Sequence, residues 1–597
     1  MMRVLNELIE ELTERVAREG GYPVLIYEAP TGYGKTVASI NFYRVLSKYY
    51  MSSGLIHVLP MRSIATEFYC KVVNSVSGDE VSYCKEVSED PIIGKAIREL
   101  RLAKHDIGYQ FMDFIDSSKA PYFLKTVLIT TFNSFFHNLA RFPIAELRKY
   151  RRHYEIPRTS IFTSSVVLDE AHLYGGDPGS GDEKTLFTAL VVGIKALVEA
   201  RVPILIESAT LPKQFTEAVI NMVRATGVNP KVISFRYGVR CGNAVGNTVL
   251  ECHDDEYVVK CLSLKWFTKV IDDEAISRIV EHHTSVGHRV LVVRNTVGKA
   301  VKTYLKIRER LNEDEVEIIH GHFTTKDRTE KLSRCRKAKV VVSTQVVEAG
   351  VNISFNTLIT DAASPSSIAQ RAGRVLRMFE DEDAYVYVVK SDGDGVYDKS
   401  VTINFTSKLV EITEKSNYNI DWRIPSNKLI DNRISFLKLI NDVYQGLDLE
   451  VDSKRYVDFV DIISSPIISQ DRLNMIYRKS EGLIYSSILL PVYVGMRPVQ
   501  TLNELIENSV PLSTNFIRVN LNKILEVDGD GLSVIVLIEG DSDEPSTYIG
   551  ESKMPLKILE DPVEFLTRSL SGNGQTLIPL AFIARPEVYN KVTGLVV

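Results

Sequence analysis

The chain has 597 residues, of which 45% are hydrophobic and 25% are charged, and its formal net charge is -5. These proportions are ordinary for a soluble globular protein, and the length predicts roughly three to five domains at about 100–200 residues each. The negative net charge excludes a protein that nucleic acid coats through bulk attraction, so any nucleic acid would lie in a local basic groove.

The N-terminal segment, residues 1–21, reads as acidic and amphipathic and not as a signal peptide. The longest apolar stretch, residues 483–495, is too short and too interrupted to cross a bilayer. The six cysteines include no C-x-x-C pair, which favours a reduced protein. We therefore expect a cytoplasmic protein with no membrane partner.

Short apolar runs without alternation recur along the chain, as expected of strands buried on both faces of a parallel sheet. One set falls within the first 210 residues and the other between 289 and 389: PVLIYE, LIHVLP, VLITT, SVVLDE and PILIES, then RVLVVRN, VEIIHG, KVVVST, TLITDA and AYVYVV. Two sets imply two α/β units. We predict a first lobe over 1–225, an interlobe connection over 226–270 where this rhythm is lost, and a second lobe over 271–400.

Residues 401–597 follow a different pattern and are predicted to form a linker and a mixed α/β accessory region. Within it, SVIVLIEGDSDEPSTYIGE (533–551) reads as a strand, an acidic turn and a second strand.

A loop that could cradle phosphates follows the first apolar run. Glycines in APTGYGKT allow backbone N–H groups to curl around phosphate oxygens, the lysine can reach the β- and γ-phosphates, and the following hydroxyl can ligate magnesium. A helix that begins near the end of this loop adds the positive end of its dipole. The alternative is a glycine turn between strand and helix. The nucleotide contacts predicted here are Ala29, Pro30, Thr31, Gly32, Tyr33, Gly34, Lys35 and Thr36.

The fourth apolar run ends in two adjacent carboxylates, which are costly at a buried strand end unless they have partners. Asp169 can hold the magnesium through water, and Glu170 can orient the attacking water. The alternative is an acidic helix N-terminus, which the helix dipole favours. His172 completes this motif, and the hydroxyls of Ser208-Ala209-Thr210 could bond to it and relay the state of the nucleotide: we group His172, Ser208, Ala209 and Thr210 as coupling residues.

In the second lobe, QRAGRVLR places Gln370, Arg371, Arg374 and Arg377 on a predicted helix. Arg374 and Arg377 are three residues apart, so they would share one face. Two guanidinium groups there could meet the γ-phosphate from across a cleft, as arginine fingers do. We assign Gln370, Arg374 and Arg377 to catalysis; the alternative is a solvated helix face.

Together these ordered motifs resemble a superfamily 2 helicase of the DEAH/DExH kind over about residues 20–390. More narrowly, STQVVEAGV (343–351) and HGHFTTKDR (320–328) are similar to the signature helicase of type I CRISPR interference. The resemblance implies two tandem RecA-like lobes with ATP and Mg²⁺ in the cleft between them, and it adds Gly350 to the nucleotide contacts. The sequence departs from the family pattern at Asn352, where an aspartate is usual. No glutamine precedes Gln110, so the glutamine that recognises adenine in many relatives has no obvious counterpart here.

The resemblance also implies a partner set. Family members unwind DNA at a crRNA-guided surveillance complex, moving 3′ to 5′ on single-stranded DNA while a histidine–aspartate (HD) nuclease cuts it. Because fewer than thirty residues precede the phosphate loop and no spaced histidines join His105-Asp106 or His253-Asp254, we expect the form in which the HD nuclease is a separate chain. A zinc site on Cys241, Cys252, His253 and Cys261 is disfavoured because the spacing matches no familiar finger.

Carried over by motif, the single-strand contacts fall on hydroxyl, amide and arginine side chains, which suit phosphates. They are Pro60, Arg62, Ser63, Thr130, Thr131, Asn133, Asn295, Thr296, Ser343, Thr344 and Gln345, although each could serve as strand-end turn chemistry instead. The basic segment 146–158, with tyrosines interleaved, suits a strand path, a solvated helix face or docking onto an acidic partner.

Two other functions stay open at this point. A DEAH-type RNA helicase outside CRISPR would carry nearly the same motifs, but winged-helix and oligonucleotide-barrel domains would follow its second lobe. A nucleotide-gated scaffold would be expected to have lost part of the catalytic set.

Overall fold

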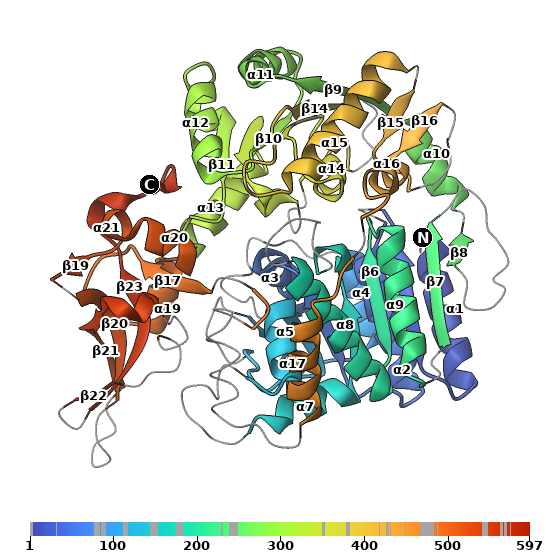
Figure 1. Cartoon of the computed structure of the whole chain (residues 1–597), viewed down its shortest axis with the longest axis horizontal. Helices are drawn as coiled ribbons and strands as arrows, with labels where there is room; N and C mark the ends of the chain where they lie inside the picture. Colours follow the sequence, from blue (N-terminus) through green and yellow to red (C-terminus); the bar gives the residue numbers. More distant parts are fainter. Residues whose placement is uncertain are drawn as a thin grey trace.

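The computed structural model describes two parallel α/β lobes and a C-terminal mixed sheet (Figure 1). It describes residues 4–597, apart from 31–32, 77–83, 85–86, 88–90, 112–117, 144–152, 175–182, 229–230, 238–248, 253, 349–352, 378–382, 417, 426–428, 430–431, 448, 466–482, 486–487, 530, 540–546, 561–564, 566–569 and 573–574. This architecture confirms the predicted fold class of two tandem RecA-like lobes followed by a mixed accessory region.

The first lobe is an eight-stranded parallel sheet in the order β3-β4-β2-β5-β6-β1-β7-β8. Its strands are β1 (Pro23–Glu28), β2 (Leu55–Leu59), β3 (Ile107–Gln110), β4 (Val127–Thr131), β5 (Ser165–Leu168), β6 (Ile204–Ser208), β7 (Lys231–Tyr237) and β8 (Val249–Cys252). Five of them are the apolar runs that the sequence predicts. The sheet continues to Cys252, beyond the predicted boundary at residue 225, because the strand KVISFRY mixes polar with apolar residues and escapes a search for apolar runs.

The helices of the first lobe follow these strands and cover the sheet. They are α1 (Val4–Arg18), α2 (Lys35–Lys48), α3 (Arg62–Asn74), α4 (Pro91–Glu99), α5 (Phe132–Leu139), α7 (Glu155–Thr163), α8 (Glu183–Glu199) and α9 (Lys213–Ala225).

The second lobe is a six-stranded parallel sheet in the order β11-β12-β10-β13-β14-β9. Its elements are β9 (Lys265–Ile271), α11 (Ile276–Ser285), β10 (Val290–Val293), α12 (Val297–Arg308), β11 (Val316–Ile319), α13 (Thr325–Cys335), β12 (Val340–Ser343), β13 (Thr357–Asp361), α14 (Pro365–Ala372) and β14 (Asp383–Val389). Since β8 belongs to the first sheet and β9 to the second, the connection between the lobes centres on α10 (Asp255–Ser263).

The segment after the second lobe touches both lobes. Its elements are α15 (Lys399–Val410), β15 (Asn419–Asp421), β16 (Arg433–Ser435), α16 (Phe436–Val443) and α17 (Ser453–Ser464). Helix α16 packs on α14 of the second lobe, and α17 packs on α8 of the first. Arg158, from the basic segment, donates to the Ile463 carbonyl at 2.8 Å, so it holds the chain's own linker; residues 144–152 of that segment lie outside the described part.

The C-terminal domain is a mixed sheet in the order β18-β17-β23-β20-β19, with β21 and β22 paired to it. Its elements are β17 (Leu489–Tyr493), α19 (Leu502–Glu507), β18 (Ser509–Ser513), α20 (Thr514–Val519), α21 (Leu521–Ile524), β19 (Val527–Asp528), β20 (Gly531–Glu539), β21 (Thr547–Pro555), β22 (Leu570–Gly572), β23 (Gln575–Ile583), β24 (Tyr589–Asn590) and β25 (Gly594–Leu595). Strands β20 and β21 pair antiparallel, which confirms the predicted hairpin.

The C-terminal tail is bound to the second lobe through the HGHFTT segment. The imidazole Nε2 of His320 lies 2.9 Å from the Thr593 carbonyl, and the Leu595 amide donates to the His322 carbonyl at 3.0 Å. His320 is completely buried in this contact. The accessory domain is therefore anchored on the second lobe.

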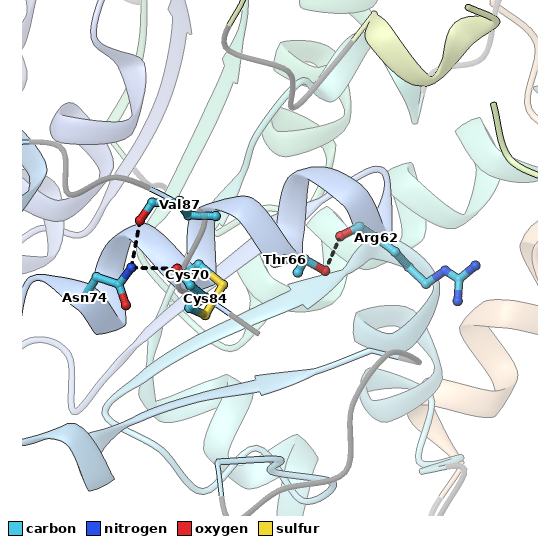
Figure 2. The surroundings of a disulfide bond; sticks show 6 residues. All are labelled: Arg62, Thr66, Cys70, Asn74, Cys84 and Val87. Carbon is cyan, nitrogen blue, oxygen red and sulfur yellow. Dashed lines mark hydrogen bonds between the residues drawn. A yellow bond between two sulfur atoms is a disulfide. The ribbon is translucent and has the colours of Figure 1, made fainter. Parts of the chain in front are cut away.

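A disulfide joins Cys70 of α3 to Cys84, with a Cα–Cα distance of 5.1 Å (Figure 2). The expectation of a reduced protein is therefore wrong. One helical turn further along α3, the Asn74 amide donates to the carbonyls of Cys84 and Val87 at 3.1 and 2.9 Å. These contacts hold Cys84 and Val87 against the helix whose first residue is Arg62.

Within the described ranges, no helix combines the length and the apolar character that a bilayer crossing requires.

The disulfide should stabilise the fold by restricting the unfolded chain. The cysteines are 14 residues apart, and closing a loop of about 15 residues is worth about 3 kcal/mol. We expect a Cys70→Ala, Cys84→Ala double variant to unfold at a lower temperature than the parent, and dithiothreitol to lower the parent's midpoint to the same value. Thermal unfolding with and without the reductant measures both effects. A midpoint that the reductant lowers as much in the double variant as in the parent would contradict the assignment.

The docking of the tail should weaken in acid. Burial, helped by the charge of the neighbouring His322, lowers the pKa of His320 to about 3. A histidine with a depressed folded-state pKa loses stability as the pH falls below its unfolded value near 6.5, by about 2 kcal/mol between pH 7 and pH 5. We expect hydrogen exchange at the tail amides, corrected for its intrinsic pH dependence, to accelerate over this range. His320→Gln should flatten the pH dependence, whereas His105→Gln, at an exposed histidine, should leave it unchanged.

Candidate nucleotide site and interlobe cleft

The phosphate loop connects the end of β1 to the start of α2. Gly34 has φ +101°, a conformation that favours glycine, and a Cβ there would lie 3.2 Å from the Asn6 amide nitrogen. This turn starts α2 at Lys35, whose Nζ donates to the Ala29 carbonyl at 3.2 Å across the loop. Thr36 follows on the first turn of α2. Thr31 and Gly32 lie outside the described residues.

Sequence reasoning missed Asn6, which supports this loop from α1. Its amide donates to the Gly34 carbonyl at 3.1 Å and its side-chain oxygen accepts from the Tyr27 hydroxyl at 2.9 Å. A single asparagine in an amphipathic helix gives no sequence signal for such a role.

Asp169 lies at the carboxyl end of β5, beside the phosphate loop. Its carboxylate is 3.3 Å from His57 Nε2 of β2 and accepts the Glu170 amide at 2.8 Å. Burial alone would raise the pKa of Asp169, but the hydrogen bond and charge of His57, together with Lys35, outweigh it and lower the pKa below its usual value. Asp169 is therefore an anion at neutral pH.

Glu170 has a left-handed backbone, with φ 50° and ψ 46°. Non-glycine residues in this region cluster at functional sites. One carboxylate oxygen lies 3.9 Å from Lys35 Nζ and the other lies 3.7 Å from His172 Nδ1. The second oxygen, Oε2, is buried and has no hydrogen-bond partner in the structure, so the carboxylate that approaches Lys35 through Oε1 keeps a lone pair to offer on Oε2.

Two further polar residues, also missed by sequence reasoning, lie beneath the loop. His57, Asp169 and Glu207 each offer an atom within 4.8 Å of the others. Burial and the charge of Asp169 raise the pKa of Glu207 well above its usual value, so Glu207 is neutral, and it accepts the Ser39 hydroxyl at 2.8 Å. The available signal was a single polar residue inside each of the apolar runs LIHVLP and PILIES.

The predicted coupling residues connect the acidic motif to the second lobe. His172 Nδ1 lies 2.7 Å from the Ser208 hydroxyl, which accepts the Thr210 amide at 3.2 Å. The Thr210 hydroxyl in turn lies 3.5 Å from Nε2 of Gln370. The structure thus places His172, Ser208, Ala209, Thr210 and Gln370 in one buried line across the cleft.

The two predicted arginine fingers do not share a helix, which corrects the sequence prediction. Helix α14 ends at Ala372, where Gly373 caps it, and Leu376 adopts a left-handed φ of 44°. Arg374 turns back and donates to the carbonyls of Val347 and Glu348 at 3.0 and 2.6 Å. The geometry therefore separates the two arginines.

Arg377 is the arginine that faces the first lobe. Burial lowers the pKa of Arg377, and the charges of Glu67 and Glu170, both from the first lobe, oppose this effect. Its guanidinium thus lies within the electrostatic reach of the carboxylate that also approaches Lys35.

Arg371, on α14, is held by contacts within the second lobe. It is completely buried and binds Glu348 Oε1 at 2.8 Å, the Thr360 hydroxyl at 2.6 Å and the Tyr397 hydroxyl at 2.8 Å. These contacts join α14 to β13 and to the loop before α15.

The predicted strand contacts gather at the carboxyl ends of paired strands, β2 with β4 and β10 with β12. Thr130 and Ser343 are buried and bond to the carbonyls of Gln110 and Ile319 at 2.7 and 2.9 Å. Gln345 donates to the Asn295 carbonyl at 3.0 Å. The others lie beside them: Pro60 and Arg62 at the start of α3, Thr131 and Asn133 at the start of α5, Thr296 capping α12, and Thr344 after β12. The side chain of Ser63, and Gly350, lie outside the described set.

Comparison with known proteins agrees with this geometry. Residues 20–218 match the family model described as DEAD/DEAH box helicase, and residues 286–380 match that of the CRISPR-associated nuclease/helicase Cas3, C-terminal. The Cas3 nuclease/helicase of Methanothermobacter thermautotrophicus is 24% identical over 64% of this chain and 42% of that protein. That of Streptococcus thermophilus is 22% identical over 62% of this chain and 40% of that protein. The chain thus matches about two fifths of the length of these relatives.

Solved structures share the fold. The T. fusca Cas3–AMPPNP crystal structure has a TM-score of 0.56 at 15% identity, covering 85% of this chain and 64% of that one. A chain in a CRISPR RNA-guided surveillance complex, captured before nicking, has a TM-score of 0.51 at 14% identity and covers 99% of this chain and 70% of that one.

Proposed function

Because residues 20–218 and 286–380 match the DEAD/DEAH box helicase and Cas3 C-terminal family models and the chain is similar to Cas3 relatives, we propose that it is a CRISPR-associated helicase, an ATP-driven motor that moves 3′ to 5′ along single-stranded DNA during CRISPR interference. The observation that carries this proposal is the pairing of Lys35 with Glu170 at 3.9 Å beside the phosphate loop, joined to the second lobe by the contact of Thr210 with Gln370 at 3.5 Å; the charge of Glu170 also acts on Arg377. Hydrolysis in such a cleft can drive relative movement of the lobes.

Each of these residues has a distinct task in the proposal. Lys35 binds the β- and γ-phosphates, since its Nζ already bridges the loop at Ala29. Glu170 orients the attacking water through its free buried oxygen. Arg377 stabilises the charge that develops on the transferred phosphoryl group, while Arg374 holds the segment 347–348 that leads to Gly350.

Mg²⁺ fits the residues that are present. The Thr36 hydroxyl and the Asp169 carboxylate are hard oxygen donors, which this ion prefers, and the lowered pKa of Asp169 keeps its carboxylate charged. When bound, the ion neutralises phosphate charge. The adjacent Glu207, being neutral, adds no negative charge to the site.

Movement along DNA would use the line from His172 through Ser208 and Thr210 to Gln370. A change in the hydrogen bonds around the nucleotide reaches Gln370 through these short contacts. The strand contacts proposed at Arg62, Thr131 and Asn133 in one lobe and at Asn295, Thr296 and Gln345 in the other then alternate their hold on the phosphate backbone.

We further propose that a crRNA-guided surveillance complex loads this motor and that an HD nuclease on a separate chain cuts the strand. Among the described residues, the group of His, Asp and Glu that could hold a metal ion is His57, Asp169 and Glu207, and it lies beneath the phosphate loop. That position supports nucleotide chemistry and not an HD nuclease centre.

ATP hydrolysis tests the motor directly. We expect single-stranded DNA to stimulate ATPase activity, and Lys35→Ala to reduce it by about a hundredfold or more, because the phosphates lose their cation. Lys48→Ala, at an exposed lysine of the same helix, should leave it unchanged. Full activity in Lys35→Ala would refute the site. Stimulation by RNA and not by DNA would replace this function with that of an RNA helicase.

The division of labour is tested by strand cleavage. The purified chain, with ATP and Mg²⁺ or Mn²⁺, should translocate on labelled single-stranded DNA without shortening it. Cleavage should appear when an HD nuclease chain is added and should require its metal. Cutting by the purified chain alone would contradict the proposal without bearing on the ATPase result.

A further inference from the structure

A second polar connection, separate from the line through Gln370, runs from the phosphate loop toward Arg377. It begins at Tyr33, which is buried between Ala29 and Lys35. The Tyr33 hydroxyl donates to the carboxylate of Asp254 at 2.7 Å, and its ring meets that of Tyr257 edge to face, with centroids 5.0 Å apart. A phosphate-loop side chain is thus tied to the connection between the lobes.

Asp254 and Tyr257 belong to the start of the interlobe helix α10. The other carboxylate oxygen of Asp254 accepts the Tyr257 amide at 3.0 Å and so caps the helix. Asp254 is 4% exposed and Tyr257 is completely buried, inside the same apolar cluster as Tyr33 and Ile424. This cap therefore depends on the position of the tyrosine in the phosphate loop.

Arg423, from the segment after β15, reaches the finger segment from the other side. It is 1% exposed, and its Nη2 donates to the carbonyls of Val375 and Leu376 at 2.7 and 3.2 Å. These are the two residues before Arg377, and Leu376 is the one with the left-handed backbone. Its neighbour Ile424 lies in the same apolar cluster as Tyr257 and Tyr33, so the Arg423 segment packs against the start of α10.

The position of Arg423 is itself fixed. The Asp421 carboxylate accepts the backbone amides of Arg423 and Ile424 at 2.8 Å each, and its second oxygen lies 3.4 Å from Arg433. Arg433 in turn donates to the Leu262 carbonyl at the end of α10, at 2.9 Å. The guanidinium of Arg423 is held on a rigid base that belongs to the interlobe connection.

We propose that Arg423 is a positioning residue for ATP hydrolysis: it fixes residues 375–377, and hence Arg377, relative to the phosphate loop through Tyr257, Asp254 and Tyr33. This inference rests on the proposed function, in which Arg377 meets the γ-phosphate. Arg423 itself stays away from the phosphates. Arg423 sets the position of the Arg377 guanidinium and couples that position to the phosphate loop.

The physical reason is the precision that a finger requires. A charge aimed at the transition state loses much of its effect when it is displaced by about 1 Å. Residues 375–377 follow the end of α14. Two of their amides are held by the Phe355 carbonyl at 2.8 Å and the Ser354 hydroxyl at 2.9 Å, and the buried guanidinium of Arg423 adds two bonds on the carbonyl side. The positive charge of Arg423 also repels that of Arg377, which favours the orientation toward Glu170.

A double-mutant cycle tests this role against a merely structural one. Arg423→Gln should lower the DNA-stimulated kcat by about tenfold or more, with the KM for ATP within about twofold of the parent, because phosphate binding is untouched. In an Arg377→Ala background the same change should cost little more, because a positioning residue has nothing left to position. Lys399→Gln, at an exposed lysine just before Arg423's own segment, is the matched control.

Equal losses in the two backgrounds would overturn the proposal. If Arg423→Gln does not fold, Tyr33→Phe provides the same test through the loss of one hydroxyl: its loss in kcat should disappear in the Arg377→Ala background and its unfolding midpoint should match the parent. An additive loss would again overturn the proposal. Lys35→Ala distinguishes failure of the proposed function from failure of the positioning role. If ATPase activity survives without Lys35, the nucleotide site is refuted. If Lys35 is essential but the losses from Arg423→Gln and Arg377→Ala are additive, only the positioning role is refuted.

Discussion

The burial of opposite charges at the carboxyl ends of the β1, β5 and β6 strands is the constraint on which this structure depends. An isolated ion in a protein interior costs far more free energy than most single contacts return, and only a partner of opposite charge makes it tolerable. Lys35 has Glu170 at 3.9 Å, and Asp169 has His57 at 3.3 Å. Glu207, the third carboxyl in this space, is kept neutral by its raised pKa. A bound triphosphate adds negative charge beside Asp169 and Glu170, so it must redistribute these partners.

The second lobe meets the same constraint in a different way. Its buried cations are locked into pairs inside the lobe: Arg371 with Glu348 at 2.6 Å, and Arg294 with Asp361 at 3.0 Å. Because these pairs are satisfied within the lobe, they make it a rigid body that keeps α14 and the strand ends in place. Arg377 differs from them, since the carboxylates that reach it, Glu67 and Glu170, belong to the other lobe. An interaction between charges on the two lobes can change when nucleotide binds, whereas an ion pair inside one lobe stays fixed.

The sequence was informative wherever a local pattern has one physical meaning. Strands buried on both faces must be apolar throughout, so all ten predicted runs are strands, while strand β7, which mixes polar and apolar residues, was missed. The order of the motifs placed Thr210 and Gln370 in one site. Side-chain direction was beyond this reasoning: Arg374 and Arg377 were assigned one face, but the helix ends at Ala372 and the backbone turns between them. The Cys70–Cys84 disulfide and the Tyr33–Asp254 contact depend on long-range packing, which the spacing of residues does not encode.

The linker adds a mechanical condition to the electrostatic one. It binds the second lobe through α16 and the first through α17, and Gln214 of the first lobe donates to the Tyr444 carbonyl between them at 3.1 Å. Arg141 fixes the far end of α17 by donating to the Ile462 carbonyl at 2.8 Å. In the described part of the chain, the backbone therefore passes between the lobes at α10 and again between Tyr444 and Asp452, and closure around nucleotide must bend both connections. Since the C-terminal tail is bound to His320 and His322, the accessory domain follows the second lobe in that movement. In the proposed motor, a change at the phosphates that moves the second lobe would therefore displace the accessory domain with it, relative to the strand contacts proposed in the first lobe.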